Sequence, residues 1–147
     1  MEIAKILWPT DFSSNAGAAL DFVQSLAEKH HAEVHVLYVI EDMGGHAPWY
    51  GEFQAGHAQD IRQWEEKKAR ERLDEICARH LAGCPLFVKH VAVGDPATEI
   101  LKLAEKEKVS LVVMSTSGSR GAFAFGSVTD KVVRNSPVPV TTIPVLR

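Results

Sequence analysis

Short apolar runs alternate along this chain with longer segments in which apolar residues recur at helical spacing. The runs are rich in Val, Ile and Leu and have the length of buried strands. They extend from Ile3 to Trp8, Glu33 to Ile40, Leu86 to Val93, Ser110 to Met114 and Val138 to Val145. After the first run, Ala19, Phe22, Val23 and Leu26 repeat every three or four positions, which predicts one buried face of a helix.

Four helices are predicted between these strands, with start and stop signals at several of their ends. Pro96 suits the first turn of the third helix, and the Asn135-Ser136-Pro137 sequence ends the fourth. The second has an apolar stripe made of Ile61, Trp64, Ala69, Leu73 and Ile76. The helices span Ser13 or Ser14 to His30, Ala58 to His80, Pro96 to Lys106 and Ser127 to Arg134.

Strict alternation of strands and helices predicts an α/β protein with a five-stranded parallel sheet and helices on both faces. Right-handed crossovers then limit the topology to a Rossmann-like or a flavodoxin-like doubly wound arrangement. The chain of 147 residues fits one domain, and it contains no internal repeat or linker. We therefore expect a single domain over residues 1–147.

One connection, from Glu41 to Gly56, is unusually long for a compact domain and contains glycine, proline and aromatic residues. Trp49, Tyr50 and Phe53 in this segment have two possible roles. They would either cover a ligand as part of a lid or pack down as a hydrophobic anchor.

Composition narrows the class of function. The formal net charge of −3 argues against a nucleic-acid partner or a membrane surface, and no apolar stretch approaches the ~18 residues of a membrane span. The acidic, strand-like start at Met1-Glu2 is unlike a signal peptide. The two cysteines, Cys77 and Cys84, are too few for a disulfide framework, which favours reduced thiols in the cytoplasm.

The most informative segment runs from Met114 to Val128, where an apolar strand enters a loop of Gly, Ser and one Arg before a helix starts. A strand, a glycine-rich loop and a helix start together present backbone N–H groups to an anion. Gly118 and Gly121 allow positive φ and close ligand approach, and Gly126 leaves room beside the helix start. The segment therefore indicates a phosphate-binding loop.

Three further residues would complete such a site. The amides of Ser127 and Val128, aided by the helix dipole, would hold a phosphate, and Arg120 would add a charged clamp. A second interpretation is purely structural. Ser127 and Asp130 have the spacing of a capping box, in which Ser127 would only cap its own helix.

The loop after the first strand, Pro9-Thr10-Asp11-Phe12-Ser13, is the other candidate. In doubly wound sheets, ligands bind at the carboxyl ends of strands where the winding reverses. Asp11 would accept a hydrogen bond from a ribose hydroxyl or a base amine. Alternatively, it would be a turn or capping residue of the first helix.

Other chemistries lack their signatures. The sequence contains no P-loop, no GxGxxG after the first strand and no GxSxG elbow, and its seven histidines have no metal-ligand spacing. No general base with a polar partner is visible, so we expect no enzyme and no catalytic residue. Slow ATP hydrolysis would depend on Asp11 alone.

Several short motifs, in their order and spacing, resemble the universal stress protein family. They cover nearly the whole chain and consist of Ile6 to Ser13, Val36 to Val39, Gly94 to Ala97, Leu111 to Met114, Gly126 to Val128 and Ser136 to Val140. The resemblance implies a five-stranded parallel sheet of the adenine nucleotide alpha hydrolase-like, Rossmann-like type. It also implies a role in stress resistance and a homodimer that pairs its last strand, here Val138 to Ile143, across a two-fold axis.

One branch of that family binds ATP through the motif G-x2-G-x9-G-[ST]. The resemblance implies that Thr10 and Asp11 face the ribose or base, Val39 touches adenine, and the glycine loop holds the phosphates of ATP or AMP, with Mg accompanying ATP. The residues expected at this site are Pro9, Thr10, Asp11, Val39, Met114, Ser115, Gly118, Arg120, Gly121, Gly126, Ser127 and Val128.

The chain departs from this motif twice. Ser115 stands at the first glycine position, and seven residues instead of nine separate Gly118 from Gly126. A shorter loop would tilt its amides away from a triphosphate, and the Ser115 side chain would crowd the ligand. The alternative is therefore the branch of the family without a nucleotide, in which a stress-response protein acts through its dimer surface.

Overall fold

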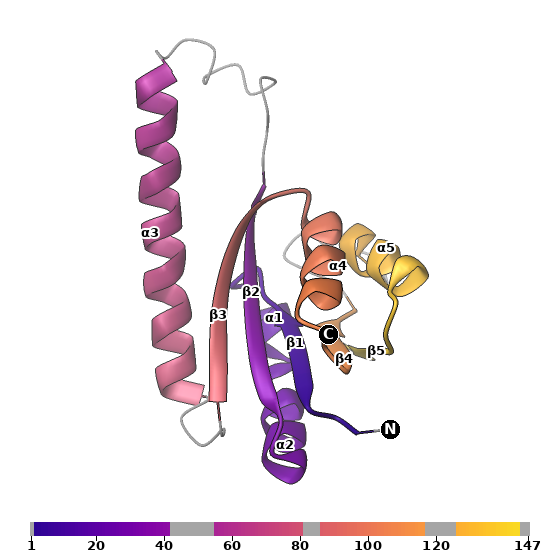
Figure 1. Cartoon of the computed structure of the whole chain (residues 1–147). Coiled ribbons are helices and arrows are strands. Elements are labelled where there is room, and N and C mark those ends of the chain that lie inside the picture. Colours follow the sequence, from indigo (N-terminus) through magenta and orange to yellow (C-terminus); the bar gives the residue numbers. More distant parts are fainter. Residues whose placement is uncertain (1, 42–54, 81–85, 117–125, 145–147) are drawn as a thin grey trace.

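The computed structural model describes residues 2–41, 55–80, 86–116 and 126–144. Five parallel strands form one sheet in the order β3-β2-β1-β4-β5 (Figure 1). The strands are β1 (Lys5–Pro9), β2 (Glu33–Glu41), β3 (Leu86–Gly94), β4 (Leu111–Ser115) and β5 (Val140–Ile143). This order matches the first five strands of the Rossmann arrangement, so the flavodoxin-like alternative is excluded. The predicted five-stranded parallel α/β fold is confirmed.

Helices cover both faces of the sheet. They are α1 (Ser14–Gly17), α2 (Leu20–His30), α3 (Ala55–His80), α4 (Pro96–Lys106) and α5 (Ser127–Asn135). One buried cluster joins α2 and α3 to one face of the sheet, and a second joins α4 and α5 to the other (Figure 1). Adjacent β1 residues alternate between them, since Ile6 and Trp8 belong to the first cluster and Leu7 to the second.

The predicted first helix is in fact two helices. The Ser13 hydroxyl caps α1 by accepting from the Ala16 amide at 3.1 Å, which confirms one of the two predicted caps. The Trp8 indole donates to the Ala16 carbonyl at 3.3 Å. The same carbonyl accepts from the Ala19 amide at 3.2 Å, which closes a tight turn, and the chain starts again as α2 at Leu20.

Four other predicted boundaries were wrong. β1 begins at Lys5 and not at Ile3, and β5 begins at Val140, because Pro139 and Pro144 flank it and cannot donate to the ladder. Glu41 still belongs to β2, and α3 begins at Ala55, so the long connection is shorter than expected. Its aromatic residues Trp49, Tyr50 and Phe53 lie outside the described residues.

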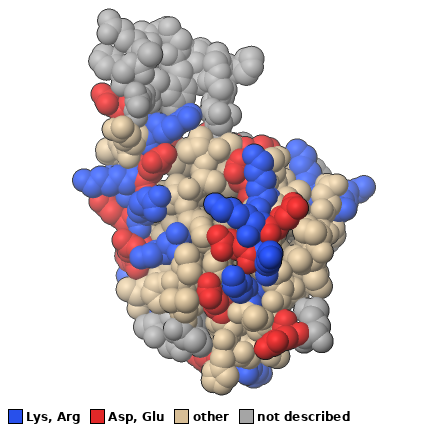
Figure 2. All heavy atoms as spheres, in the orientation of Figure 1, with Lys and Arg blue, Asp and Glu red and all other residues tan. Residues whose placement is uncertain are grey.

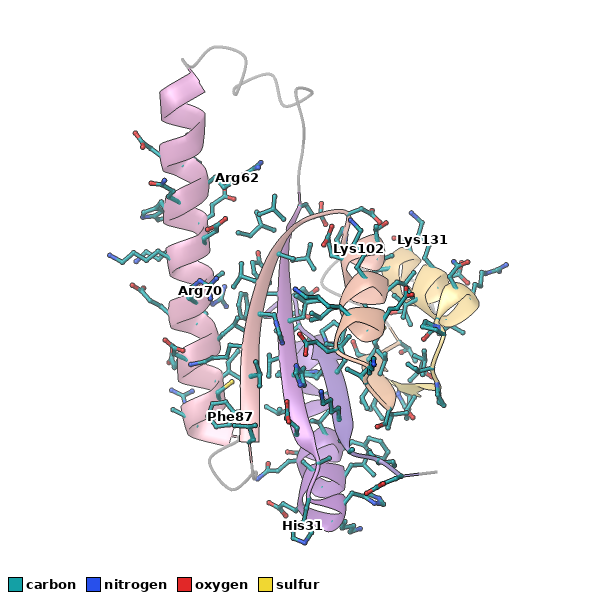
Figure 3. The ribbon with its side chains drawn as sticks, in the orientation of Figure 1. His31, Arg62, Arg70, Phe87, Lys102 and Lys131 are labelled. Carbon is teal, nitrogen blue, oxygen red and sulfur yellow. The ribbon has the colours of Figure 1, made fainter. Side chains whose placement is uncertain are left out.

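Among the described side chains of α3, the buried ones lie in its carboxyl half. Ala69, Leu73 and Cys77 are buried, whereas Trp64 is 61% exposed. The amino-terminal half, which carries Arg62, extends past the ends of the strands (Figures 1 and 3). Trp64 was therefore wrongly assigned to the buried stripe, because helical spacing does not show where the supporting sheet ends. Within the described residues, no helix has the length and apolarity to cross a membrane.

The turn from β3 into α4 follows the sequence closely. Gly94 has φ of 151°, and a Cβ at this position would lie 2.8 Å from Glu99 Oε1. The Asp95 carboxylate caps α4 by accepting from the Thr98 amide at 3.1 Å and from the Thr98 hydroxyl at 2.8 Å. These hydrogen bonds, first that of the hydroxyl and then that of the amide, lower the pKa of Asp95 below its ordinary value.

We predict that Asp95→Ala destabilises the protein by about 1 kcal/mol through loss of this cap. Because the pKa of Asp95 is lowered in the folded state, its contribution is present above pH ~4 and is lost as the pH falls through the lowered pKa. Asp95→Asn should keep the cap and lose that acid dependence. Urea unfolding at pH 7 and pH 3 measures both effects. Equal stability of the alanine variant and the wild type at pH 7 would contradict the assignment.

Candidate functional site

The winding reverses between β1 and β4. From β1 the chain continues into α1 on one face of the sheet, and from β4 it continues towards α5 on the other. Their carboxyl ends therefore diverge at neighbouring positions, which is where doubly wound sheets bind ligands. The described residues that flank the predicted glycine loop, Thr116 and Gly126, and the loop after β1 lie at this edge.

Pro9 and Thr10 form the β1 side of the edge. Pro9 is the last residue of β1 and pairs with Leu37 of β2. Thr10 is 7% exposed, and its amide donates to the Leu37 carbonyl at 2.8 Å. Its hydroxyl accepts from the Phe12 amide at 3.0 Å. Thr10 is thus held by the backbone on both sides and is a fixed wall of the site.

Asp11 is exposed and builds a tight turn. Its Oδ1 accepts from the Ser13 amide at 2.9 Å and also from the Ser13 hydroxyl. The carboxylate therefore has the turn role that was one of its two predicted roles. The same turn holds Asp11 at the edge of the sheet in one orientation, so a role in ligand binding is compatible with this geometry.

Phe12, which sequence reasoning did not select, has a backbone conformation unusual for a bulky residue, with φ of 65°. Its ring packs on Tyr38 with centroids 4.4 Å apart, and the Arg72 guanidinium lies 4.3 Å from its centre. Burial, followed by Glu65, raises the pKa of Tyr38. Backbone strain of this kind concentrates at functional sites. The one feature of the sequence that could have identified Phe12 is its position directly after Asp11.

A cleft of about 230 Å³ lies beside Phe12 on the α3 side. Phe12, Arg72, Glu75, Ile76 and Arg79 line it. Arg79 is already paired with Glu75 at 3.1 Å. The cleft therefore adjoins the β1 loop on the α3 side, and its lining includes no residue of β4 or α5.

The β4 side of the edge is pinned by three hydrogen bonds. The Thr116 amide donates to the Ile143 carbonyl at 2.9 Å, and the Gly126 amide donates to the Thr116 carbonyl at 2.8 Å. The buried Thr129 hydroxyl donates to the Ser115 carbonyl at 3.1 Å. Thr116 and Gly126 are therefore held next to each other, and the start of α5 is fixed to the end of β4.

The prediction that Ser127 caps α5 was wrong. The N-cap residue is Gly126, in extended conformation, and Ser127 is the first helical residue. Asp130 pairs instead with Arg134, one helical turn on, at 2.9 Å. Among the described residues, no side chain caps this helix, and Ser127 is exposed. The amino terminus of α5 thus presents amides and the positive end of its dipole to the edge of the sheet.

The other predicted site residues fall into two groups. Met114 is buried at the end of β4, Val39 is half-buried near the end of β2, and Val128 lies in the first turn of α5. All three pack in or against the cluster between the sheet and α4 and α5. Gly118, Arg120 and Gly121 lie outside the described residues. The structure therefore brings together the two ends of the predicted loop and leaves its middle untested.

Charge around this edge is mixed. Acidic and basic side chains are interspersed over the described surface in Figure 2. Lys102 of α4 pairs with Glu99 at 3.5 Å, and both Lys102 and Lys131 point outward from their helices (Figure 3). Within the described residues, no group of three or more His, Cys, Asp or Glu side chains is arranged to hold a metal ion.

The comparisons with known proteins agree on one protein family. The model of the universal stress protein family matches residues 2–144. Universal stress protein MJ0531 of Methanocaldococcus jannaschii is 29% identical over 141 residues, covering 95% of this chain and 81% of that protein. The solved structure of protein MJ0577 from the same organism has a TM-score of 0.86 at 27% identity and covers 100% of this chain and 99% of that one.

A more distant structure shares the fold alone. The universal stress protein family protein from Arabidopsis thaliana, solved with AMP bound, has a TM-score of 0.65 at 18% identity. It covers 97% of this chain and 92% of that one.

We predict that Thr129→Val loosens the start of α5, because the buried hydroxyl that holds the Ser115 carbonyl is lost. The cost should be about 1–3 kcal/mol, measured by urea unfolding. Amide exchange at Gly126 should accelerate, since its own hydrogen bond to Thr116 depends on the same anchor. Thr129→Ser keeps the hydroxyl and should leave Gly126 exchange unchanged. Equal protection of Gly126 in the valine variant and the wild type would refute the anchor.

Proposed function

Because this chain belongs to the universal stress protein family, we propose that it is a cytoplasmic stress-response protein that binds an adenine nucleotide, ATP or AMP, at the carboxyl edge of β1 and β4. The observation that carries the proposal is the start of α5. Its first turn carries no side-chain cap from the described residues, and it is fixed beside the end of β4. An uncapped helix start at a switch point is suited to a phosphate group.

The phosphates would bind at the amides of Ser127 and Val128. Ser127 is exposed, so its hydroxyl is also accessible to a phosphate oxygen. With ATP, Mg²⁺ would be held largely by the phosphates, as Mg²⁺ commonly keeps several waters and takes few protein ligands.

The adenosine would lie against the β1 loop. Thr10 is a rigid wall, and Asp11 is exposed and held in a fixed turn suited to a ribose hydroxyl or a base amine. Val39, near the end of β2, offers a half-buried apolar contact for the adenine ring. The binding of AMP by the Arabidopsis protein, which shares this fold, agrees with such an arrangement.

The two departures in the glycine loop define the alternative. Ser115 is 9% exposed, and its carbonyl is engaged by Thr129, so this residue serves to anchor α5. Anchoring of this kind is equally useful in a protein that binds no nucleotide and acts through its dimer surface. We favour nucleotide binding because no side chain among the described residues caps the helix start, and a purely structural turn would be expected to supply a cap. We propose a sensing role without turnover, with no catalytic residue.

We predict that millimolar Mg-ATP or AMP, but not GTP, raises the unfolding temperature of protein first shown to carry no retained nucleotide. At 100 times Kd the stabilisation should be about 2.7 kcal/mol, a shift of several degrees. Ser127→Asp places a negative charge at the first turn of α5. This charge should stabilise the helix through its dipole and abolish the nucleotide shift by repelling phosphate.

Gln63→Glu is the matched control, since it makes the same charge change on the exposed amino-terminal half of α3. It should keep the full nucleotide shift. If the wild type shows no shift with either adenine nucleotide, the protein belongs to the branch that acts without one. If Ser127→Asp responds as the wild type does, the nucleotide binds elsewhere.

We also propose a homodimer formed by β5. Among the described strands, β5 pairs with β4 alone and is an edge of the sheet (Figure 1). The carbonyls of Pro139 and Ile143 accept from Val112 and Thr116. Because a strand alternates its bonding direction, the backbone of Thr142 faces the open edge. Pairing with the β5 of a second copy would cover that edge.

We predict that Thr142→Pro converts the dimer to a folded monomer, because proline removes an outward N–H without touching the bonds to β4. Thr142→Val keeps the N–H and should remain dimeric. Sedimentation velocity measures the mass, and circular dichroism checks the fold. A dimer that survives the proline substitution would rule out β5 as the interface.

A further inference from the structure

A hydrogen-bonded chain of three titratable side chains lies on the sheet, remote from the proposed nucleotide edge. Glu33 Oε1 lies 2.7 Å from His35 Nε2, and His35 Nδ1 lies 2.8 Å from His90 Nε2. His35 is 2% exposed, and His90 is half-buried. The histidines have no metal-ligand spacing in the sequence, and nothing local predicts this pairing, because His35 and His90 are 55 residues apart.

Strand register explains why the three groups meet. His35 pairs with Val88 and Leu37 pairs with His90, so the two histidines are diagonal neighbours on adjacent strands. Val34 and Val36 point to the cluster under α2 and α3, and His35 therefore points to the opposite face, towards α4. Figure 3 shows this layer of side chains between β2 and α4. The chain thus ties edge strand β3 to β2.

The geometry describes a hydrogen bond between the rings. The two imidazoles are nearly coplanar, at 15°, and their centroids are 5.1 Å apart. The distance between the ring centroids is longer than the distance between the two nitrogens by about the sum of the two ring radii. The two nitrogens therefore lie on the line that joins the centroids and point directly at each other. A shared metal ion would require the two lone pairs to converge at an angle on a third point. A single proton between the two nitrogens lets one ring donate and the other accept a hydrogen bond.

The partners fix the proton positions. A carboxylate only accepts, so His35 donates from Nε2 to Glu33. In its neutral form His35 then accepts at Nδ1, and His90 donates from Nε2. One added proton, taken up at His90 Nδ1, can be balanced by transfer of the shared proton to His35, which places the positive charge beside Glu33. A second added proton would put N–H groups face to face at 2.8 Å and break the contact.

Other charged groups around the chain are few. Lys5 of β1 pairs in register with Glu33, and its ammonium donates to the Glu107 carbonyl at 3.2 Å. Lys106 and Glu107, at the end of α4, act on His90 electrostatically: Glu107 raises its pKa and Lys106 lowers it. Lys89 points to the opposite face, where it pairs with Asp74 of α3. Burial, followed by His35, lowers the pKa of His90.

We propose that the Glu33–His35–His90 chain is an acid-sensitive latch that holds edge strand β3 to β2 beneath α4 and releases it when both imidazoles become protonated. An unfolded chain binds a proton on each histidine, whereas the latched protein resists the second. With the pKa of His90 lowered, the stabilisation is present above pH ~6.5 and is lost as the pH falls through the lowered pKa. This inference does not depend on nucleotide binding.

The test compares His90→Gln with His30→Gln across pH 5 to 8. Glutamine cannot take a proton, and its amide can offer NH2 to a neutral His35 or its oxygen to a protonated one. His30 is exposed at the end of α2 and serves as the control. In the wild type and His30→Gln, the unfolding constant from urea titration should rise by up to about tenfold per pH unit on acidification below pH ~6.5. In His90→Gln, this rise of the unfolding constant on acidification should be lost.

Exchange of the β3 amides should accelerate over the same pH range in the wild type beyond its intrinsic pH dependence, and not in His90→Gln. If the glutamine variant does not fold, imidazole nitrogen resonances of the wild type decide the question. Two separated protonation steps for His35 and His90 support the latch. Independent titration of both near the ordinary histidine value, or the same pH dependence of unfolding in His90→Gln and the wild type, would overturn it.

Discussion

The burial of β1 on both faces and both edges is the constraint on which the rest of the structure depends. Ile6, Leu7 and Trp8 are each at most 1% exposed, so this strand has no polar face and must bond to β2 on one side and β4 on the other. Since the chain leaves β1 towards one face and β4 towards the other, their ends must separate. The site therefore exists because a fully buried strand sits at the reversal of winding.

Much of this architecture could be predicted because it follows from local patterns of apolar and polar residues. Continuous apolar runs in β1, β2 and β4 indicate strands that are covered on both faces, and parallel strands place all their carboxyl ends at one edge. That alone was enough to predict that the loops carrying Thr10 and Ser127 start from the same edge, whereas Val39 was named only through the family resemblance. The strand order could not be predicted, because a run of Val and Leu does not encode which neighbour it pairs with.

The errors have a common physical origin in contacts between residues distant in sequence. Ser127 and Asp130 match a capping box, yet the helix starts where the Gly126 amide meets Thr116 and the Thr129 hydroxyl meets Ser115. Those two contacts set the phase of the helix and override the local signal. The cluster of Phe12, Tyr38 and Arg72 was missed for the same reason, since α3 supplies the arginine from a distant part of the chain.

The proposed nucleotide site and the proposed latch both include residues of β2, which pairs with β3 along its whole length, and this has a thermodynamic consequence. β2 pairs with β3 from Glu33 with Leu86 to Glu41 with Gly94, so His35 and Val39 lie on the same strand within the same set of pairs. A nucleotide that contacts Val39 in the ordered sheet binds the latched state preferentially. Acid that opens the latch then weakens nucleotide binding, and by linkage the nucleotide must oppose the uptake of the second proton to the same extent. Proton and nucleotide would thus be antagonists acting through the register of β2 and β3, with no contact between their sites.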